Sequence, residues 1–338
     1  MNIAINGFGR IGRQTLRIIL KSHPKMNVVL INDLSENDVL ANLFEFDSVY
    51  RKYDGIVFST EKSLTVDGKE MKMTAEMDPG KLPHKELNVD VVLECTGVFR
   101  ERDKAAAHLK AGAKKVILSA PAKGEIDGTF CIGVNENEYD SKKMDIISNA
   151  SCTTNCLAPM AKVINDNFTI KHGIMTTIHS YTASQKIVDG PAKKDWRRGR
   201  AAAMNIFPTT TGAAKAIGLV LPELEGKMDG MAVRVPTPTG SLNDLTCVIE
   251  KDASAEEVNT AFKKASEGAM KGILGYEERP LVLQDFVGDS RSSIIDAPYT
   301  KVSKQGDSIL LKTMGWYDNE WGYSNRLVEL AELIGSKI

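Results

Sequence analysis

"NIAINGFGRIG", residues 2–12, is the stretch that decides the fold of the first half of the chain. A short apolar run, typical of a buried strand, leads into glycines spaced as Gly7-x-Gly9-x-x-Gly12, and apolar residues at helical spacing follow. Glycines at this spacing permit a tight turn, a close approach of backbone to a diphosphate, and close packing of helix on strand. The N-terminus of the helix attracts the negative charge. We therefore predict a dinucleotide-binding strand–turn–helix unit.

An acidic residue supports this prediction. A second apolar run, residues 26–33, ends in Asp33, about 20 residues beyond Gly12. A carboxylate at that place binds the 2′-hydroxyl of the adenosine ribose and repels a 2′-phosphate. The glycines alone would fit any glycine-rich turn, but strand, helix and acid agree. The sequence predicts a site for NAD in preference to NADP.

The pattern of the remaining chain predicts two domains. Apolar runs alternate with helical patterns up to residue 151, which favours an α/β, Rossmann-type doubly wound parallel sheet. We expect an NAD-binding domain over 1–150, with a C-terminal helix over 319–338 packing back on it. An α+β catalytic domain with a mainly antiparallel sheet is expected over 151–318. Its expected strands include 176–182, 231–239, 244–252 and 308–318, and its expected helices are 212–219 and 254–270.

Composition excludes several classes of function. The 338 residues are 42% hydrophobic and 26% charged, with a net charge of −1, so nothing marks a nucleic-acid binder. We expect no signal peptide, because residues 2–10 show no basic region followed by an apolar core, and no apolar run approaches the ~18 residues of a membrane span. Five cysteines, none in a C-x-x-C pair, favour free thiols in a reducing cytoplasm and no metal site.

"SNASCTTNCLAP", residues 148–159, holds a candidate nucleophile. Cys152 sits where a strand pattern ends and a helical pattern begins, and the positive end of a helix dipole lowers the pKa of a thiol. Cys156, one turn further on, is expected to pack in the core. An arbitrary cysteine is more often buried and inert, so the function of Cys152 depends on its partners.

A thiol nucleophile needs a base nearby. His179, in "TTIHSYT", lies at the end of an expected strand among hydroxyl residues and is the candidate. A lone histidine is also often satisfied by its neighbours. The other four histidines lie in lysine-rich or loop contexts, and we expect them on the surface: His23, His84, His108 and His172.

Six motifs together resemble those of the phosphorylating glyceraldehyde-3-phosphate dehydrogenase family: "INGFGRIGR", "SNASCTTNCLAP", "HSYTASQK", "PTTTGAAKA", "GMAVRVPTPTGS" and "WYDNEWGYSNR". They follow the family's order and cover nearly the whole chain. The resemblance implies that Cys152 attacks the aldehyde of D-glyceraldehyde 3-phosphate and that His179 is the base. A hemithioacetal loses hydride to NAD, and inorganic phosphate releases the acyl thioester as 1,3-bisphosphoglycerate.

The resemblance also assigns the ligand-binding residues. Thr182 and Arg234 are similar to the family's ligands for the substrate phosphate. The site for the attacking phosphate is matched by Ser151, Thr153, Arg198, Thr211 and Gly212. Matches to cofactor-binding positions, beside the three glycines and Asp33, are Arg10, Ile11, Ser119 and Asn319, the last for the nicotinamide carboxamide.

Three further segments of the sequence bear on the cofactor. Gly190-Pro191 resembles the NAD-using form of the loop after His179. Met77 replaces the Arg or Lys that the family usually has before "DP", which puts one cofactor contact in doubt. His84 stands where the family commonly shows an aromatic residue, so we expect this loop to sit differently.

Alternatives remain open on the sequence. An erythrose-4-phosphate dehydrogenase shares the Cys–His pair, although "PTTTGAAK" retains the phosphate-site pattern. A biosynthetic NADPH-using relative is opposed by Asp33 and Pro191. A thiol redox sensor or a binding protein without turnover would need no NAD fingerprint. The resemblance further implies a cytoplasmic homotetramer in which residues 180–200 lie at a subunit interface.

Overall fold

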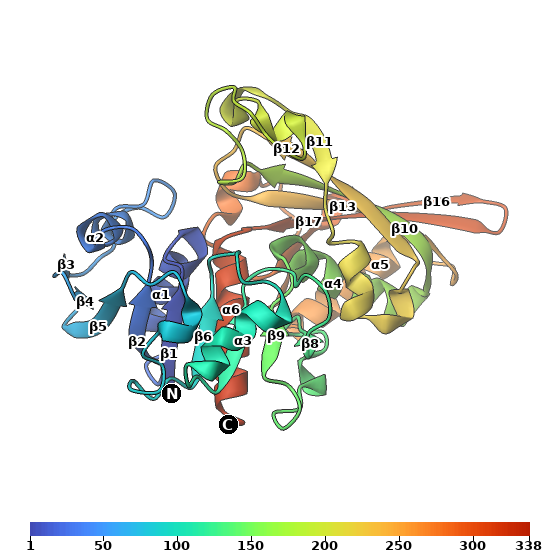
Figure 1. Cartoon of the computed structure of the whole chain (residues 1–338). Coiled ribbons are helices and arrows are strands. Elements are labelled where there is room, and N and C mark those ends of the chain that lie inside the picture. The colour runs from blue at the N-terminus through green and yellow to red at the C-terminus, as the bar shows by residue number, and fades with distance from the viewer. The chain divides into compact units, whose positions relative to one another are not determined.

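The computed structural model describes all residues, 1–338, and the chain divides into two compact units (Figure 1). Unit 1 comprises Met1–Phe130, Glu136–Ala150 and Ser324–Ile338. Unit 2 comprises Cys131–Asn135 and Ser151–Tyr323. The main division therefore falls inside the cysteine-containing motif, between Ala150 and Ser151.

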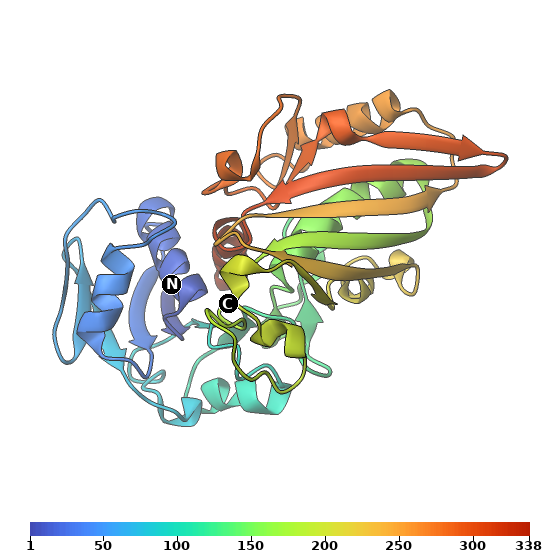
Figure 2. The ribbon, with the colours of Figure 1, turned by 90° about the horizontal axis from the view of Figure 1, so that it is seen from above.

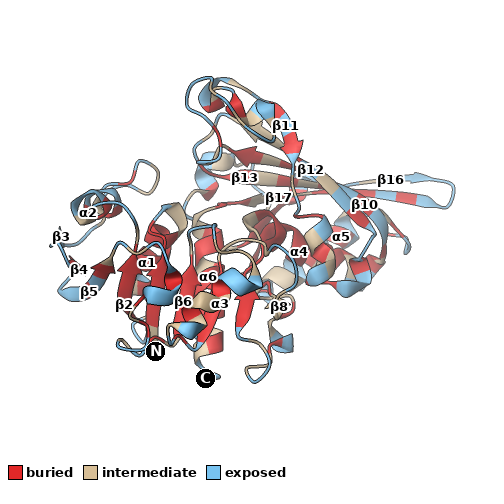
Figure 3. Cartoon of the chain, in the orientation of Figure 1, coloured by how far each residue is buried: buried red, intermediate tan, exposed pale blue.

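Unit 1 is built on a nine-stranded sheet with the order β3-β4-β5-β2-β1-β6-β7-β9-β8. All pairs from β5 to β8 are parallel, which confirms the Rossmann-type prediction. Buried residues concentrate on its central strands and on α1 (Figure 3). The parallel strands are β1 (Asn2–Asn6), β2 (Asn27–Asn32), β5 (Lys69–Thr74), β6 (Val91–Glu94), β7 (Lys115–Leu118), β8 (Gly128–Thr129) and β9 (Ile146–Ser148). The helices are α1 (Arg10–Ser22), α2 (Asn37–Glu45) and α3 (Arg102–Lys110).

An antiparallel extension of this sheet was missed by the sequence analysis. β3 (Val57–Ser59), β4 (Ser63–Val66) and β5 form a meander that adds to the edge at β2. β5, "KEMKMT", alternates exposed lysine and glutamate with buried methionine, so only one face of it is apolar. This pattern is weaker than the continuous apolar runs of the central strands.

Unit 2 contains an eight-stranded, mainly antiparallel sheet with the order β11-β12-β10-β13-β17-β15-β14, and β16 pairs with β17. Figure 2 shows its long strands side by side, from green β10 to red β17. Only the pairs β10–β12 and β14–β15 are parallel. The strands are β10 (Ile170–Ser180), β11 (Phe207–Thr210), β12 (Met228–Val235), β13 (Ser241–Ile249), β14 (Leu274–Glu277), β15 (Ser293–Asp296), β16 (Lys301–Gln305) and β17 (Ser308–Tyr317).

Three longer helices begin after residue 150. α4 (Cys152–Phe168) carries Pro159 inside it, and α5 (Ala255–Glu267) starts with a capping box made by Ser254 and Glu257. α6 (Trp321–Gly335) starts in unit 2 and continues into unit 1. The remaining turns of helix are short 3₁₀ segments: Pro79–Lys81, Glu136–Glu138, Trp196–Gly199, Ala202–Met204, Lys215–Leu219, Pro222–Leu224, Leu283–Phe286 and Ala297–Tyr299.

Two expectations are wrong. The helix expected over 212–219 is only a 3₁₀ segment, Lys215–Leu219, and it contains Gly218, a residue type that disfavours a longer helix. His84 and His108 are fully buried rather than on the surface. Their rings contact each other, and His108 also contacts Glu94, so polar partners within the core replace water.

No helix is long and apolar enough to cross a membrane. No group of three or more His, Cys, Asp or Glu side chains is arranged to hold a metal ion.

Candidate active site

The glycine-rich turn of unit 1 allows close packing that no side chain would permit. Gly7 has a φ of +94°, and a Cβ atom there would lie 2.7 Å from the backbone nitrogen of Thr96. A Cβ atom on Gly12 would lie 2.2 Å from the carbonyl oxygen of Gly7. A Cβ atom on Gly9 would meet nothing within 4 Å, so open space lies in front of this residue. The turn thus forms a cradle that a diphosphate backbone can approach.

The first turn of α1 places the N-terminus of a helix beside this cradle. No side chain caps this helix at Gly9, and its first turn contains no acidic residue. Arg10 directs Nη1 of its guanidinium to Asp47, 2.5 Å away, and the start of the helix presents backbone N–H groups. These N–H groups and the helix dipole suit a negatively charged ligand.

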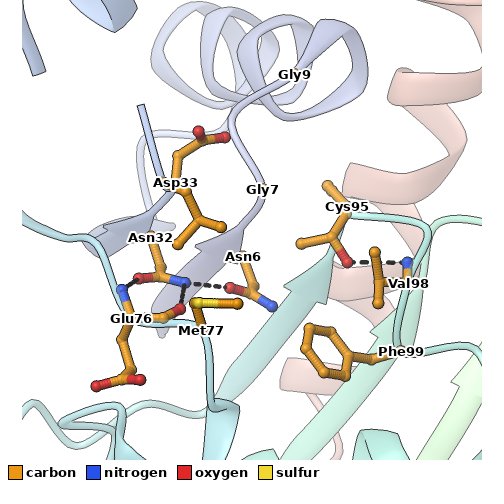
Figure 4. A pocket seen from close by; sticks show the side chains of 12 residues that line it. Asn6, Gly7, Gly9, Asn32, Asp33, Glu76, Met77, Cys95, Val98 and Phe99 are labelled. Carbon is orange, nitrogen blue, oxygen red and sulfur yellow. Dashed lines mark hydrogen bonds between the residues drawn. The ribbon is translucent and has the colours of Figure 1, made fainter. Parts of the chain in front are cut away.

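A cavity of about 420 Å³ adjoins this turn (Figure 4). Asp33 lies in its wall and accepts hydrogen bonds from the backbone N–H of Phe8, at 2.8 Å, and of Ser35, at 3.0 Å. The carboxylate is thereby fixed beside the turn where a ribose hydroxyl would bind. The remaining wall is mixed polar and apolar, and includes Asn6, Asn32, Leu34, Glu76, Met77, Cys95, Val98 and Phe99.

Met77, the departure from the family pattern, is 75% exposed and lines the cavity. Asn32 holds its neighbour Glu76 by donating to the Glu76 carbonyl oxygen at 2.9 Å and accepting from its N–H at 2.8 Å. Ser119 directly follows β7 and acts to lower the pKa of the thiol of Cys95, another residue of the wall, although burial raises that pKa overall. The cavity, the cradle and the fixed carboxylate all fit NAD.

In unit 2, Cys152 is the first residue of α4, and Ser151 caps the helix by accepting a hydrogen bond from the Thr154 N–H at 3.0 Å. The Sγ atom of Cys152 lies 3.5 Å from Nε2 of His179, the penultimate residue of β10. Cys156 is fully buried and contacts Ser293 and the Gly315 carbonyl oxygen, which confirms its expected packing role.

Strand register places the partners of His179. On β12 the residue opposite His179 is Arg234, and on β13 it is Ser241, which in turn lies opposite Tyr317 of β17. Directly opposed residues share one face of a sheet, so four strands present a single row of polar side chains. The Tyr317 hydroxyl contacts Thr153 at 3.0 Å and Thr177 at 2.8 Å, and its ring meets His179 edge-on.

The expected low pKa of Cys152 is wrong. Burial raises the pKa of the thiol, although the hydrogen bond with Thr153 and the charge of Arg234 act in the opposite direction. Burial and the charge of Arg234 lower the pKa of His179 to about 3. Both groups are therefore uncharged at neutral pH, and the imidazole is available as a base.

Two arginines supply positive charge beside this pair. Arg234 forms no ion pair with a carboxylate, and its buried Nε atom has no hydrogen-bond partner. Arg198 contacts Thr209 at 3.2 Å and Ser184 at 3.0 Å, and Ser184 contacts Thr182 at 3.0 Å. Arg198 and Arg234 each lower the pKa of His179, and Arg198 lowers that of Arg234, which shows mutual proximity. Arg198 also pairs with Asp195 at 3.7 Å, whereas Arg234 has no carboxylate partner. A guanidinium without a carboxylate partner, such as that of Arg234, suits an anion.

The remaining residues of unit 2 expected to bind ligands make no direct hydrogen bond to Cys152, His179 or the two arginines. Thr211 accepts a hydrogen bond from the Ala213 N–H at 3.2 Å, and Gly212 has open space in front of it. Neither contacts Arg198 or Arg234. Asn319, between β17 and α6, is 5% exposed and accepts hydrogen bonds from Ser180, Gly240 and Ser241.

Sequence reasoning missed several residues of this region. Four hydroxyl residues and a tyrosine connect the expected ligands: Thr177, Ser184, Thr209, Ser241 and Tyr317. All five lie inside stretches already quoted, but only strand register and loop contacts show what they bind.

A thiol paired with an imidazole is one means by which enzymes bind a carbonyl carbon covalently, and unit 1 carries a dinucleotide cradle. Together they define an NAD-dependent oxidoreductase that acts on an aldehyde group.

The chain belongs to the glyceraldehyde-3-phosphate dehydrogenase family. Residues 1–102 match the family's NAD binding domain, and residues 151–319 match its C-terminal domain. The chain is 54% identical over 337 residues to glyceraldehyde-3-phosphate dehydrogenase 1 of Bacillus subtilis, covering 100% of this chain and 99% of the relative. It is likewise 54% identical to the Geobacillus stearothermophilus enzyme, with the same coverage. The identity to glyceraldehyde-3-phosphate dehydrogenase 2 of Streptomyces avermitilis is 51%, also with the same coverage.

Proposed function

We propose that this protein oxidises D-glyceraldehyde 3-phosphate to 1,3-bisphosphoglycerate with NAD and inorganic phosphate, a step of glycolysis. The observation that carries the proposal is the 3.5 Å contact between Cys152 Sγ and His179 Nε2 beside two arginines that lie where anions would be neutralised. Membership of the family supplies the substrate class.

Cys152 is the proposed nucleophile and His179 the base. As Sγ attacks the aldehyde carbon, Nε2 of His179 takes the thiol proton, and the developing oxyanion is stabilised by the imidazolium and the Cys152 backbone N–H. The proton passes to that oxygen to give a hemithioacetal. Nε2 removes the same proton when the carbon is oxidised to an acyl thioester. Bound NAD supplies the acceptor for the hydride.

The two anions would be bound by different residues. Thr182 and Arg234 are proposed to hold the phosphate of the substrate. The attacking phosphate is proposed to bind at Ser151, Thr153, Arg198, Thr211 and Gly212. Arg198 already contacts Ser184 and Thr209, so its guanidinium is held in place before an anion arrives. The hydroxyls of Ser151 and Thr153 each make two contacts within the chain, and a hydroxyl can donate one hydrogen bond and accept two.

Cofactor binding is proposed at Gly7, Gly9, Arg10, Ile11, Gly12, Asp33, Ser119 and Asn319. The cradle and the carboxylate in the cavity wall support the first group. Asp33 would oppose a 2′-phosphate, which favours NAD over NADP.

The test is NADH formation, followed by absorbance, from purified protein, NAD and glyceraldehyde 3-phosphate with and without inorganic phosphate. We expect turnover that depends on phosphate. Turnover indifferent to phosphate would indicate a hydrolytic relative such as an erythrose-4-phosphate dehydrogenase. No turnover with NAD or NADP would leave only a sensing or binding role for Cys152.

We further propose that the enzyme is a cytoplasmic homotetramer. Large apolar side chains of the segment between β10 and β11 are exposed in the single chain, which supports an interface between copies: Ile187, Val188, Trp196, Met204 and Ile206. Light scattering of the purified protein would give the mass. A monomeric mass would contradict this proposal.

A further inference from the structure

Asn319 is held by three donors that converge on one atom. Its side-chain oxygen Oδ1 accepts hydrogen bonds from the Gly240 N–H at 2.9 Å, the Ser180 hydroxyl at 3.0 Å and the Ser241 hydroxyl at 3.1 Å. Its amide nitrogen Nδ2 makes no hydrogen bond within the chain. A nearly buried amide is thus fully engaged on one side and open on the other.

The backbone of Gly240 decides which way the amide faces. An N–H group can only donate, so the atom it contacts must be the oxygen of Asn319 and not the nitrogen. Gly240 is itself fixed, because it has a φ of +83° and a Cβ atom there would lie 2.5 Å from Leu283. A residue with a side chain would therefore not fit at position 240, and the conformation of the turn that carries this donor depends on glycine.

Ser241 is a directed donor. Its Oγ atom accepts a hydrogen bond from the Ser180 N–H at 3.3 Å, which leaves its single proton for Asn319. Ser180 and Ser241 are both essentially fully buried, so water does not compete for these hydroxyls. The adjacent Asp318 accepts from Thr239 at 3.2 Å and from the Gly288 N–H at 2.8 Å, which ties down the loop on both sides.

Ser180 also reaches the catalytic base. Its carbonyl oxygen contacts His179 Nδ1 at 2.8 Å and accepts from Arg234 Nη1 at 2.7 Å, while its hydroxyl donates to Asn319. The same residue therefore orients the imidazole and the amide.

We propose that Ser180 and Ser241 are positioning residues that lock the Asn319 amide so that only its NH₂ group faces a ligand. This inference rests on the proposed role of Asn319 at the nicotinamide carboxamide. An NH₂ group locked in this way donates a hydrogen bond to the carbonyl oxygen of that carboxamide and cannot bind its NH₂ group. The nicotinamide ring then presents one of its two faces, because turning the ring over would carry the carboxamide away from Asn319.

The test compares two ligands that differ only in the nicotinamide. Calorimetry would give the dissociation constants of NAD and of ADP-ribose for the full-length wild type, Ser241→Ala, Ser180→Ala and Asn319→Ala. Ser241→Thr retains the hydroxyl and serves as the conservative variant, and Ser303→Ala, on exposed β16, is the remote control. A second measurement follows the face to which deuterium from a labelled aldehyde is transferred.

We expect Ser241→Ala and Ser180→Ala to weaken NAD roughly 5- to 20-fold, the effect of losing one or two buried hydrogen bonds, and to leave ADP-ribose unchanged. Ser241→Thr should recover most of the loss, and the alanine variants should transfer some deuterium to the opposite face. Equal weakening of both ligands would overturn the inference, because it would indicate a general structural role.

The outcomes separate this inference from the proposed function. If Asn319→Ala weakens the binding of NAD but not of ADP-ribose, and neither serine variant does so, the positioning role is overturned and the catalytic proposal stands. If Asn319→Ala does not weaken the binding of NAD relative to that of ADP-ribose, the positioning role is overturned as well. Failure of the proposed function would be seen independently, as absence of phosphate-dependent NADH formation by the wild type.

Discussion

Nη1 of Arg234 lies 2.9 Å from Nδ1 of His179, the ring nitrogen opposite the one that faces Cys152. The contact follows from the parallel pairing of β10 and β12, which places the two residues directly opposite each other. A fixed positive charge at Nδ1 disfavours a second proton on the imidazole. Arg234 therefore acts on the base as well as on any anion that binds beside it.

Arg234→Gln is expected to raise the KM for the aldehyde roughly 10- to 100-fold, because a charge-assisted contact to phosphate is lost. It should also raise the pKa of His179 above about 3, because one of the two main causes of its lowering is removed. Protonation of the base would then reduce kcat/KM at a higher pH than in the wild type. Steady-state NADH formation between pH 5 and 8 tests both effects. An unchanged KM and an unshifted acid limb would contradict this role.

Cys152→Ser is expected to abolish NADH formation, because a serine hydroxyl is a far weaker nucleophile and forms no thioester. NAD binding, measured by calorimetry, should persist because the cradle lies in unit 1. Cys156→Ala is the matched control. It should remain active and lose on the order of 1 kcal/mol of stability, because it leaves a small cavity in the core. Comparable inactivation of both variants would argue against a unique thiol.

Gly9→Ala and Gly12→Ala should differ in what they impair. The Cβ atom on Gly9 meets no protein atom, so folding stability should be retained while NAD binding weakens at least tenfold, since the methyl group enters the diphosphate space. The Cβ atom on Gly12 collides with the Gly7 carbonyl oxygen, so that variant should unfold at lower denaturant concentration. Urea unfolding and NAD calorimetry distinguish them. Tight NAD binding by Gly9→Ala would place the diphosphate elsewhere.

The buried histidine pair predicts acid sensitivity of unit 1. His84 Nε2 lies 2.9 Å from His108 Nδ1, and His108 Nε2 lies 3.1 Å from Glu94. Burial, and secondarily the charge of His108, lower the pKa of His84 to about 4 from its usual 6.5. Between these pH values the unfolded chain binds a proton that the folded chain does not. The free energy of unfolding should therefore fall as pH drops from 6.5 to about 4, by roughly 2–3 kcal/mol, and be unaffected above that window.

His84→Phe removes the titrating group and keeps an apolar ring, so its unfolding free energy should depend less on pH within that window. Urea unfolding at pH 7.5, 6 and 5 measures the difference from the wild type. His172→Gln, at an exposed histidine, is the control and should follow the wild type. Parallel curves for the wild type and His84→Phe would mean that other groups cause the acid sensitivity.

The parts of the fold that the sequence predicted are those with strong local signals. β1, α1 and the glycines form one contiguous pattern, and α4 begins at the cysteine motif as expected. The β3–β5 meander was missed because its alternation is partly polar. His84 and His108 were assigned to the surface because a lysine-rich neighbourhood says nothing about the side that faces the core.

The motifs named Cys152, His179 and the arginines, and the sequence by itself determined their chemistry, because a thiol, an imidazole and a guanidinium carry their reactivity in any fold. Tertiary structure alone decided the row of Arg234, His179, Ser241 and Tyr317 across four strands, because register is set by pairing between segments far apart in the chain. It also decided the protonation states. The helix dipole predicted a lowered thiol pKa, but burial by the surrounding fold raises it, since removing water from a charged group outweighs a partial charge at a helix end.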